Sequence, residues 1–437
     1  MGIEIITLLI ILALFSLMAM GVPLGASTLL VSVASALFYF GPPGLILVGS
    51  NVAHVFTKYT LVAVPFFVFM ANILEKSGVA RDLFNSMAIL GGQMRGGVAV
   101  QTIFVSVILA AMSGIVGGEI VLLGLIALPQ MFRLGYDRKL SIGSIVASGS
   151  LATLIPPSVV LIVYGAEAGV SVRDLFSAGV GPGMLLAGLY ITYVMIRCRM
   201  NPEMGPVYDA PEAKLPFFER MQYLKGLILP FLLIFGVLGS IYTGVATVTE
   251  SAALGAVGAV LIAVIRKELS IQGLRDALWS TTITTGSIVW LIVGAVSLVG
   301  IYNIMGGTNF LKSLLTGMDV APIVVILIMM AIIMLLGTFM DWIAIVFITV
   351  PVFAPVVVDL GYDPVWFGIL FAMNIQIYML SPPFGPACFY LKSVAPKDVT
   401  LQEIFVAVLP FIGLQLIGLT LVLIFPEIAM WLPNLGK

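Results

Sequence analysis

Two short turns interrupt long apolar stretches of the chain, and each contains residues that could bind a cation. The first reads Met112-Ser-Gly-Ile-Val-Gly-Gly-Glu119, and the second reads Leu336-Gly-Thr-Phe-Met-Asp-Trp342. Glycine and hydroxyl residues in a mid-membrane turn leave backbone carbonyl groups without helical partners, which is tolerated only inside protein or beside a cavity. Hydroxyl, carbonyl and carboxylate oxygens are hard ligands of the kind that Na⁺ prefers. Both turns are therefore candidate Na⁺ sites.

A second interpretation of these turns stays open. Each could be a tight helix-to-helix connection whose polar groups are satisfied by neighbouring protein, with Glu119 and Asp341 stabilised at helix N-termini by the helix dipole. Under the ion-site hypothesis, the candidate Na⁺ ligands at the turns and at two nearby proline pairs are Ser113, Gly114, Glu119, Pro156, Gly337, Thr338, Asp341 and Pro382.

A proline pair follows each turn inside an apolar run, at Pro156-Pro157 and Pro382-Pro383. Proline removes a backbone donor and disfavours helix in the residue before it, so each pair predicts a broken helix. A kink used only for packing is the alternative. Polar residues crowd both breaks and could bind a small polar solute beside the turns; the candidates are Ser148, Ser150, Thr153, Asn374, Gln376 and Ser381.

Composition places the chain in a lipid bilayer. Of its 437 residues, 61% are hydrophobic and only 9% are charged, whereas about 25% of residues are charged in soluble proteins. The net charge of −1 provides no basic surface for nucleic acid. Two distant cysteines, Cys198 and Cys388, and the single histidine, His54, provide neither a zinc site nor a thiol redox motif.

Uncharged apolar runs predict the membrane crossings, because about 20 apolar residues span a hydrocarbon core. Two apolar runs differ from these crossings. Each has one acid and a small-residue break in its middle, which leave helical arms of only about 15 residues, or roughly 22 Å. We interpret these runs, 98–132 and 321–357, as re-entrant hairpins. The predicted crossings are 5–53 and 226–265, with two crossings each, and 59–75, 140–166, 175–196, 277–304, 364–391 and 404–426.

The two halves of the chain repeat each other. Pro129, Leu134-Gly-Tyr-Asp137 and Pro156-Pro157 recur as Pro355, Leu360-Gly-Tyr-Asp363 and Pro382-Pro383, all at one offset. A shared offset indicates internal duplication. We therefore predict a first repeat over 1–196, with hairpin 98–132 and broken helix 140–166, a cytoplasmic linker over 197–225, and a second repeat over 226–437, with hairpin 321–357 and broken helix 364–391.

Flanking charges predict opposite orientations for the repeats. Arg133, Arg138 and Lys139 surround the first Leu-Gly-Tyr-Asp copy, whereas the second follows Asp359 and adjoins no Lys or Arg. Basic loops stay in the cytoplasm, so we expect ten crossings, with both termini periplasmic. The predicted cytoplasmic segments are 76–95, 133–139, 197–225, 266–275 and 392–397.

The expected fold is thus an all-α polytopic membrane protein with two inverted-topology repeats, each containing a re-entrant helical hairpin and a Pro-Pro broken helix. Such repeats are typical of secondary transporters, whose sites lie where discontinuous helices meet. Outside the turns, we assign Glu250 to the first turn of a helix that is capped by Thr249.

Several motifs together resemble the large membrane subunit, DctM/SiaM type, of tripartite ATP-independent periplasmic (TRAP) transporters, over essentially the whole chain. They are Ser113-Gly114, ASGSLATLIPPSVVLIVYG (147–165), GVATVTESAALGA (244–256) and LSPPFGPACFYL (380–391). The resemblance implies Na⁺-coupled uptake of organic acids such as C4-dicarboxylates, 2-oxo acids or sialic acid. It also implies a periplasmic substrate-binding protein, a small four-helix membrane subunit, and an elevator motion of the kind seen in the ion-transporter superfamily.

We therefore expect a Na⁺-coupled secondary transport subunit of a bacterial inner membrane that imports a small organic anion, and not an enzyme. No Lys or Arg lies in the middle of an uncharged run, so helix N-termini, hydroxyls and bound cations would hold the anion. The alternative is a stand-alone cation/proton or citrate-like antiporter of the same architecture. A membrane-embedded enzyme and a passive channel fit less well, because no His-rich or paired-carboxylate group is present and opposed hairpins suit alternating access.

Overall fold

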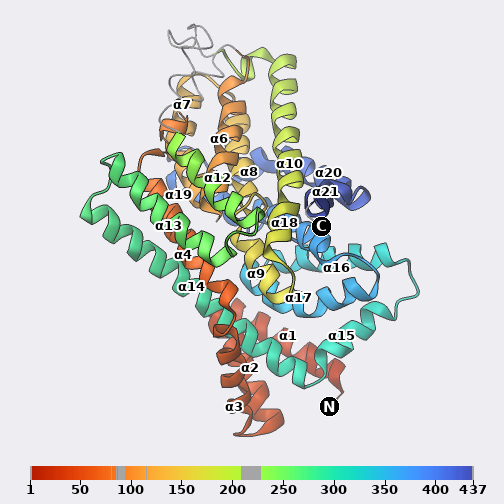
Figure 1. Cartoon of the computed structure of the whole chain (residues 1–437). Helices are drawn as coiled ribbons and strands as arrows, with labels where there is room; N and C mark the ends of the chain where they lie inside the picture. The colour runs from red at the N-terminus through yellow and green to blue at the C-terminus, as the bar shows by residue number, and fades with distance from the viewer. Residues whose placement is uncertain are drawn as a thin grey trace.

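Every regular element that the structure describes is a helix (Figure 1). In this computed structural model the described residues are 2–79, 81–84, 86, 94–114, 116–207 and 228–435. Six helices in these ranges are long and apolar enough to cross a membrane, and several further apolar helices are shorter. The predicted class, an all-helical membrane protein with many crossings, is therefore confirmed.

One group of helices packs around α14 (Ile271–Ile304), a helix of 34 residues that runs diagonally across Figure 1. Helices α2, α3, α4 and α15 contact α14 directly. Helix α13 joins the group through α4, α12 joins it through α13, and α1 joins it through α2 and α15. We call this set the α14 group. Its other members are α1 (Ile3–Ala19), α2 (Leu24–Phe40), α3 (Gly44–Phe56), η1 (Tyr59–Val62), α4 (Ala63–Lys76), α12 (Ile228–Tyr242), α13 (Val248–Ile265) and α15 (Gly307–Thr316).

A second group contains both predicted hairpins and both proline pairs, and we call it the hairpin group. It meets the α14 group where α14 and α15 contact α17 and where α4 contacts α6 and α9. Its members are α6 (Gly97–Ser113), α7 (Gly118–Arg133), α8 (Arg138–Gly149), η2 (Ser150–Thr153), α9 (Val159–Ala168), α10 (Val172–Met200), η3 (Pro202–Met204), α16 (Pro322–Gly337), α17 (Trp342–Asp359), α18 (Pro364–Leu380), α19 (Pro386–Val394), α20 (Leu401–Ile424) and α21 (Glu427–Leu435).

Both predicted hairpins are pairs of contacting helices that are joined at the predicted turns. Helix α6 has 17 residues and α7 has 16, whereas α16 has 16 and α17 has 18. At 1.5 Å per residue these arms are about 24–27 Å long, less than a hydrocarbon core of roughly 30 Å. The lengths are compatible with re-entry, which itself stays a prediction.

The two Leu-Gly-Tyr-Asp copies fold into the same turn. Gly135 and Gly361 both adopt the left-handed backbone that ends a helix, with φ of 80° and 82°. Asp137 and Asp363 then cap the following helix, and their side chains accept a hydrogen bond from its first turn at 2.8 Å and 2.7 Å. Equal geometry at equivalent positions supports the duplication that the sequence indicates.

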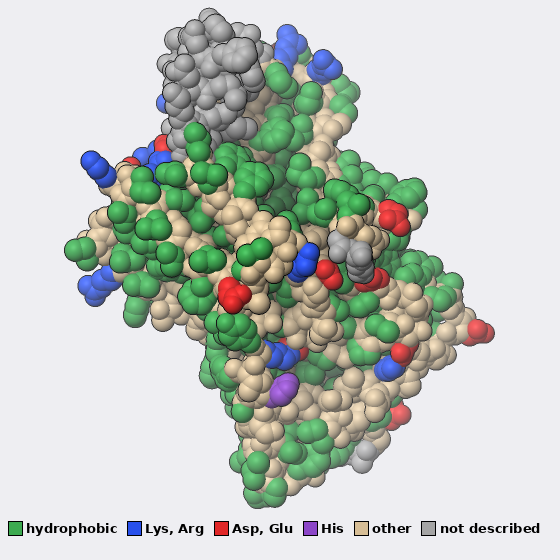
Figure 2. Space-filling model, in the orientation of Figure 1, with side chains coloured by type: hydrophobic (Ala, Val, Ile, Leu, Met, Phe, Trp, Pro, Cys, Tyr) green, Lys and Arg blue, Asp and Glu red, His purple; other side chains and the backbone are tan. Residues whose placement is uncertain are grey.

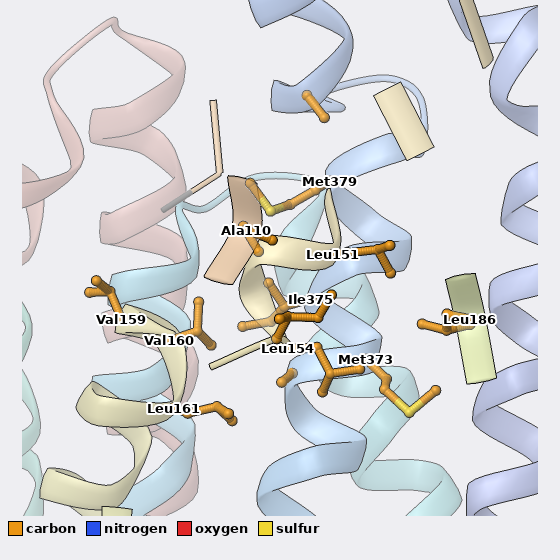
Figure 3. Packing of buried hydrophobic residues seen from close by; sticks show 14 of the residues in the cluster. Ala110, Leu151, Leu154, Val159, Val160, Leu161, Leu186, Met373, Ile375 and Met379 are labelled. Atoms are coloured by element: carbon orange, nitrogen blue, oxygen red, sulfur yellow. The ribbon is translucent and has the colours of Figure 1, made fainter. Parts of the chain in front are cut away.

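Both proline pairs break their helices, as predicted. The first pair lies between η2 and α9, and the second lies between α18 and α19. The core of the hairpin group lies where the two broken helices meet, because α18 packs against both η2 and α9. Figure 3 shows Leu154 close to Ile375 and Met373 there, and all three side chains are buried.

Ion pairs join residues that lie in the predicted cytoplasmic segments or close to their ends. They link Lys76 with Asp276 at 3.3 Å, Arg266 with Asp82, and Arg138 with Asp398 and Glu403 at 2.7 Å each. The segments predicted on the opposite side are also joined among themselves, through Lys58–Glu167 at 2.5 Å and Lys312–Asp359 at 2.6 Å. On the face shown in Figure 2, many Lys and Arg side chains gather toward the upper end.

Two helix boundaries differ from the sequence prediction. The run 5–53 contains three helices rather than two, because the break at Gly41-Pro42-Pro43 ends α2 and starts α3. Helix α10 continues to Met200, beyond the predicted end of the first repeat at 196, and Arg197 and Arg199 lie in its last turn, where cations are favourable. Residues 208–227, most of the predicted linker, lie outside the described residues.

The predicted cap of α13 is wrong. Thr247, not Thr249, is the N-cap: its hydroxyl accepts from the Glu250 amide at 3.3 Å, and the Glu250 carboxylate accepts from the Thr247 amide at 2.8 Å. Thr247 has the extended backbone that an N-cap requires, whereas Thr249 is buried inside the helix. The assignment of Glu250 to the first turn is confirmed.

Candidate functional site

The first hairpin turn packs onto the proline break of its own repeat. Gly114 ends α6 with φ of 65°, and its carbonyl accepts a hydrogen bond from the Val159 amide at 3.0 Å. A Cβ atom at this position would collide with the Pro157 carbonyl. Only glycine allows this close approach. The structure thus brings together Gly114 and the Pro156-Pro157 break, which sequence reasoning had placed side by side.

Glu119 lies in the first turn of α7 and is only 2% exposed. The Ser113 hydroxyl donates a hydrogen bond to its Oε1 atom. Its Oε2 atom is buried and has no hydrogen-bond partner within the part of the chain that the structure describes. Because buried polar atoms normally have partners, this oxygen is open to a cation or to a hydrogen-bond donor. Ser113 and Glu119 are therefore adjacent, as a shared ion site requires.

At the second turn the polar groups are bonded within the hairpin. Asp341 caps α17 through a hydrogen bond from the Ile343 amide to its Oδ1 at 2.9 Å, and the Thr338 hydroxyl donates to the Leu335 carbonyl at 2.7 Å. Gly337 packs tightly on the ring of Tyr378 in α18. This geometry matches the capping interpretation of Asp341. Pro382 lies in the break between α18 and α19.

The candidate solute-binding residues of the first broken helix are buried against their own backbone. Ser148 donates to the Ile145 carbonyl at 3.3 Å, Ser150 to Ala147 at 2.7 Å, and Thr153 to Ser150 at 3.1 Å. Gln415 of α20 reaches the Ser150 hydroxyl at 3.2 Å. A solute would reach these hydroxyls only after local rearrangement.

The second broken helix contains a polar side chain whose hydrogen-bonding groups are less fully used. Asn374 donates to the Met330 carbonyl of α16 at 2.7 Å, and Ser381 donates to the Ile377 carbonyl at 2.7 Å. The amide nitrogen and oxygen of Gln376 are buried, and neither has a hydrogen-bond partner in the described ranges. Of the six predicted solute-binding side chains, Gln376 thus has the largest unused hydrogen-bonding capacity.

A cavity of about 380 Å³ lies between the α14 group and the first hairpin, within the usual range of about 300–1,000 Å³ for small-molecule sites. Ser113 and Glu119 line its hairpin side, but the six predicted solute-binding residues do not line it. The polar lining residues that sequence reasoning missed are Asn72 and Glu75 of α4, Ser280 and Thr284 of α14, and Tyr390 of α19.

Sequence spacing could have revealed part of this wall. Asn72 and Glu75 are three residues apart, and Ser280 and Thr284 are four apart, so each pair shares one helix face inside an apolar run. The described lining residues include no Lys, Arg or His, as the uncharged runs suggested. Within the described residues, no three His, Cys, Asp or Glu side chains form a metal-binding group.

Comparison with known proteins agrees with this architecture. Residues 11–428 match the family described as "Tripartite ATP-independent periplasmic transporter, DctM component". The chain is 30% identical over 406 residues to the C4-dicarboxylate TRAP transporter large permease protein DctM of Pseudomonas aeruginosa, covering 92% of both chains. It is 31% identical over 383 residues to the ectoine/5-hydroxyectoine TRAP transporter large permease protein UehC of Ruegeria pomeroyi, covering 86% of both chains.

The fold also resembles a solved structure. MtrF of Neisseria gonorrhoeae, which is described as illuminating a class of antimetabolite efflux pumps, superposes with a TM-score of 0.63 over 92% of this chain and 93% of that chain, at 14% identity. This likeness shows a common membrane-transporter fold. The relatives are named as transporter permease subunits and not as enzymes. The chain therefore belongs to the DctM component family, the large permease subunits of tripartite ATP-independent periplasmic transporters.

Proposed function

We propose that this chain is a Na⁺-coupled transport subunit that imports a small organic acid across a bacterial inner membrane. A periplasmic binding protein delivers the solute, and a small membrane subunit accompanies the chain. The observation that best supports the proposal is the cavity between the two helix groups, which has the first hairpin turn as one wall. A turn placed there can close over a solute or open to release it.

The proposed Na⁺ ligands lie at the two hairpin turns. At the first turn they are Ser113, Glu119 and the carbonyls of Gly114 and Pro156; at the second they are Thr338, Asp341 and the carbonyls of Gly337 and Pro382. Inward movement of one charge through 100 mV releases about 2.3 kcal/mol. Two co-transported cations would therefore supply several kcal/mol for accumulation.

The sidedness of the ion pairs supports the proposed inverted topology. Arg138, beside the first Leu-Gly-Tyr-Asp turn, pairs with Asp398, which directly follows the predicted cytoplasmic segment 392–397. Asp359, beside the second turn, pairs with Lys312, which we expect on the other side. We place both termini in the periplasm on this basis. In this scheme the hairpin group slides against the α14 group, as an elevator, and carries the solute-binding residues of the broken helices with it.

The solute is a small organic acid, but its identity is open because relatives differ. One similar permease is named for C4-dicarboxylates and another for ectoine. A net anion would depend on hydroxyls, helix N-termini and bound Na⁺, because the described lining of the cavity contains no Lys or Arg.

Uptake by proteoliposomes tests the proposal. The chain is reconstituted with its small membrane subunit and binding protein, and accumulation of radiolabelled organic acids is measured under an inward Na⁺ gradient, with a K⁺ gradient as the control. Accumulation that requires Na⁺ and both partners is expected. Robust H⁺-driven transport of free solute by the chain alone would instead identify the stand-alone antiporter.

A further inference from the structure

We infer that the cavity between α4, α14 and the first hairpin selects a zwitterionic solute, one that carries a positively charged nitrogen together with its carboxylate. The inference rests on the proposed transport function and deepens it by naming the substrate class. An ammonium or amidinium group on the solute would lie against Glu119 and Glu75.

The charges of the lining residues come first. Glu75 of α4 and Glu119 of α7 face the same cavity from opposite helix groups. The described lining contains no cationic side chain. A dicarboxylate entering this space would place further carboxylates beside two acids, whereas a cationic nitrogen would complement these acids.

The unpartnered oxygen of Glu119 is the second observation. Its Oε1 atom already accepts from Ser113, whereas the buried Oε2 has no partner among the described residues, and the whole residue is only 2% exposed. A buried carboxylate oxygen requires a donor or a cation. An N–H group of a cationic nitrogen satisfies both needs through one charge-assisted hydrogen bond.

The same lining also suits the other end of such a solute. Ser280 and Thr284 place hydroxyl groups on one face of α14, and Tyr390 adds a phenol from α19. Hydroxyl groups can donate hydrogen bonds to a carboxylate without a guanidinium or ammonium group. The cavity thus offers two acids to a cationic nitrogen and hydroxyl donors to a carboxylate.

This assignment gives Glu119 Oε2 to the solute and leaves Ser113, Gly114 and Pro156 for a Na⁺ ion at the first turn. The two roles of Glu119 predict different outcomes. If Glu119 contacts the solute, loss of its charge weakens the binding of zwitterions selectively. If Glu119 binds only Na⁺, the same loss raises the Na⁺ concentration that every solute requires by an equal factor.

Matched solutes test the inference on the full-length chain in detergent. Binding of 3-aminopropanoate against succinate, and of 4-aminobutanoate against glutarate, is measured by titration calorimetry at fixed Na⁺. Each pair differs by one ammonium in place of one carboxylate. The wild type should bind the zwitterions more tightly than the dianions. Glu119→Gln should lower the affinity for the zwitterions about tenfold without lowering the affinity for the dianions.

Glu75→Gln provides a second variant at an exposed position on the opposite wall, in case Glu119→Gln does not fold. Glu427→Gln is the matched control, because Glu427 is exposed on α21 and does not line the cavity. Tighter binding of dianions by the wild type, binding of neither class, or an equal loss for both classes in Glu119→Gln and Glu75→Gln would overturn the inference.

The transport assay separates this inference from the function on which it rests. Na⁺-driven uptake of dicarboxylates alone would leave the proposed function standing and refute the zwitterion site. Selective binding of zwitterions without any Na⁺-driven uptake would support the zwitterion site and refute the proposed transport function.

Discussion

The two hairpin turns occupy equivalent places in the two repeats, yet they use their acids differently. Asp341 caps α17 and accepts a backbone hydrogen bond at 2.9 Å. Glu119 lies within the first turn of α7, binds the Ser113 hydroxyl, and directs a second, unpartnered oxygen into buried space beside a cavity. One acid shapes its turn, and the other remains available for a ligand.

The comparison indicates that the matching segments of the two halves agree more closely in backbone conformation than in side-chain chemistry. The Leu-Gly-Tyr-Asp turns match in glycine conformation and in aspartate capping. At the offset that aligns them, however, Asp341 falls opposite position 115 and not opposite Glu119. The two acids are therefore not counterparts, and we expect the first hairpin to dominate solute selection.

The largest expected contrast between the repeats is the side of the membrane that each one faces. Lys139→Cys and Asp359→Cys place single thiols at exposed positions beside the two Leu-Gly-Tyr-Asp turns, in a chain from which the buried Cys198 and Cys388 are removed. Impermeant maleimide added to intact cells should label position 359 only, and inside-out vesicles should reverse the result. Labelling of both positions from one side would refute the inverted topology.

Glycine substitutions at the turns should differ next most strongly. Gly114→Ala forces a side chain into a left-handed conformation, which costs about 1–2 kcal/mol, and drives it into the Pro157 backbone. We expect uptake to fall to background and the melting temperature to drop. Gly337→Ala keeps a helical backbone and meets the Tyr378 side chain, so partial uptake should survive. Equal uptake by both variants would mean that the first turn is not the tighter contact.

Removal of ion ligands should shift Na⁺ dependence without abolishing transport. Asp341→Asn retains an oxygen that can accept from the Ile343 amide, so the cap persists while the charge is lost. Ser113→Ala removes a hydroxyl next to Glu119. Each change should raise the Na⁺ concentration for half-maximal uptake about tenfold, measured at constant ionic strength. Wild-type Na⁺ dependence in both variants would place the ions elsewhere.

The smallest expected effect concerns an ion pair that joins the two repeats. The Arg138 guanidinium binds Asp398 at 2.7 Å and holds the pKa of that carboxyl below its usual range. Because the pKa is lower in the folded state, this stabilisation is present above the unfolded value of about 3.9 and is lost as the pH falls. Arg138→Gln should lower the melting temperature slightly at pH 7.

The control for that prediction is the same measurement in acid. Near pH 3 the carboxyl of the wild type becomes increasingly protonated, so the difference between wild type and Arg138→Gln should shrink. A difference that stays constant from pH 7 to pH 3 would show that Arg138 acts by packing, for example through its contact with the Phe132 ring, and not through Asp398.

Much of the architecture could be predicted from local sequence patterns. Proline pairs break helices because the ring removes a donor and restricts the preceding residue, and both breaks occur where expected. Small-residue turns divided 98–132 and 321–357 into helix pairs for similar local reasons. The three-helix organisation of 5–53 was missed because the uncharged run hid a second break at Gly41-Pro42-Pro43.

The candidate site was predictable only in part. Sequence alone identified Ser113 and Glu119 as neighbours at a turn, because residues so close in the chain must lie near each other. It could not indicate that Glu75, Ser280 and Tyr390 share a cavity with them, since these residues come from three distant helices. Nor could it indicate that Ser148, Ser150 and Thr153 are bonded to their own backbone.

The sequence by itself determined where helices start, break and repeat, because capping, proline geometry and apolar length act over a few residues. Only the tertiary structure decided which polar groups meet. The environment of a carboxylate depends on every helix packed around it. Glu119 and Asp341 are both acids in similar turns, yet Glu119 has a carboxylate oxygen that is not bonded within the described residues, whereas Asp341 caps a helix.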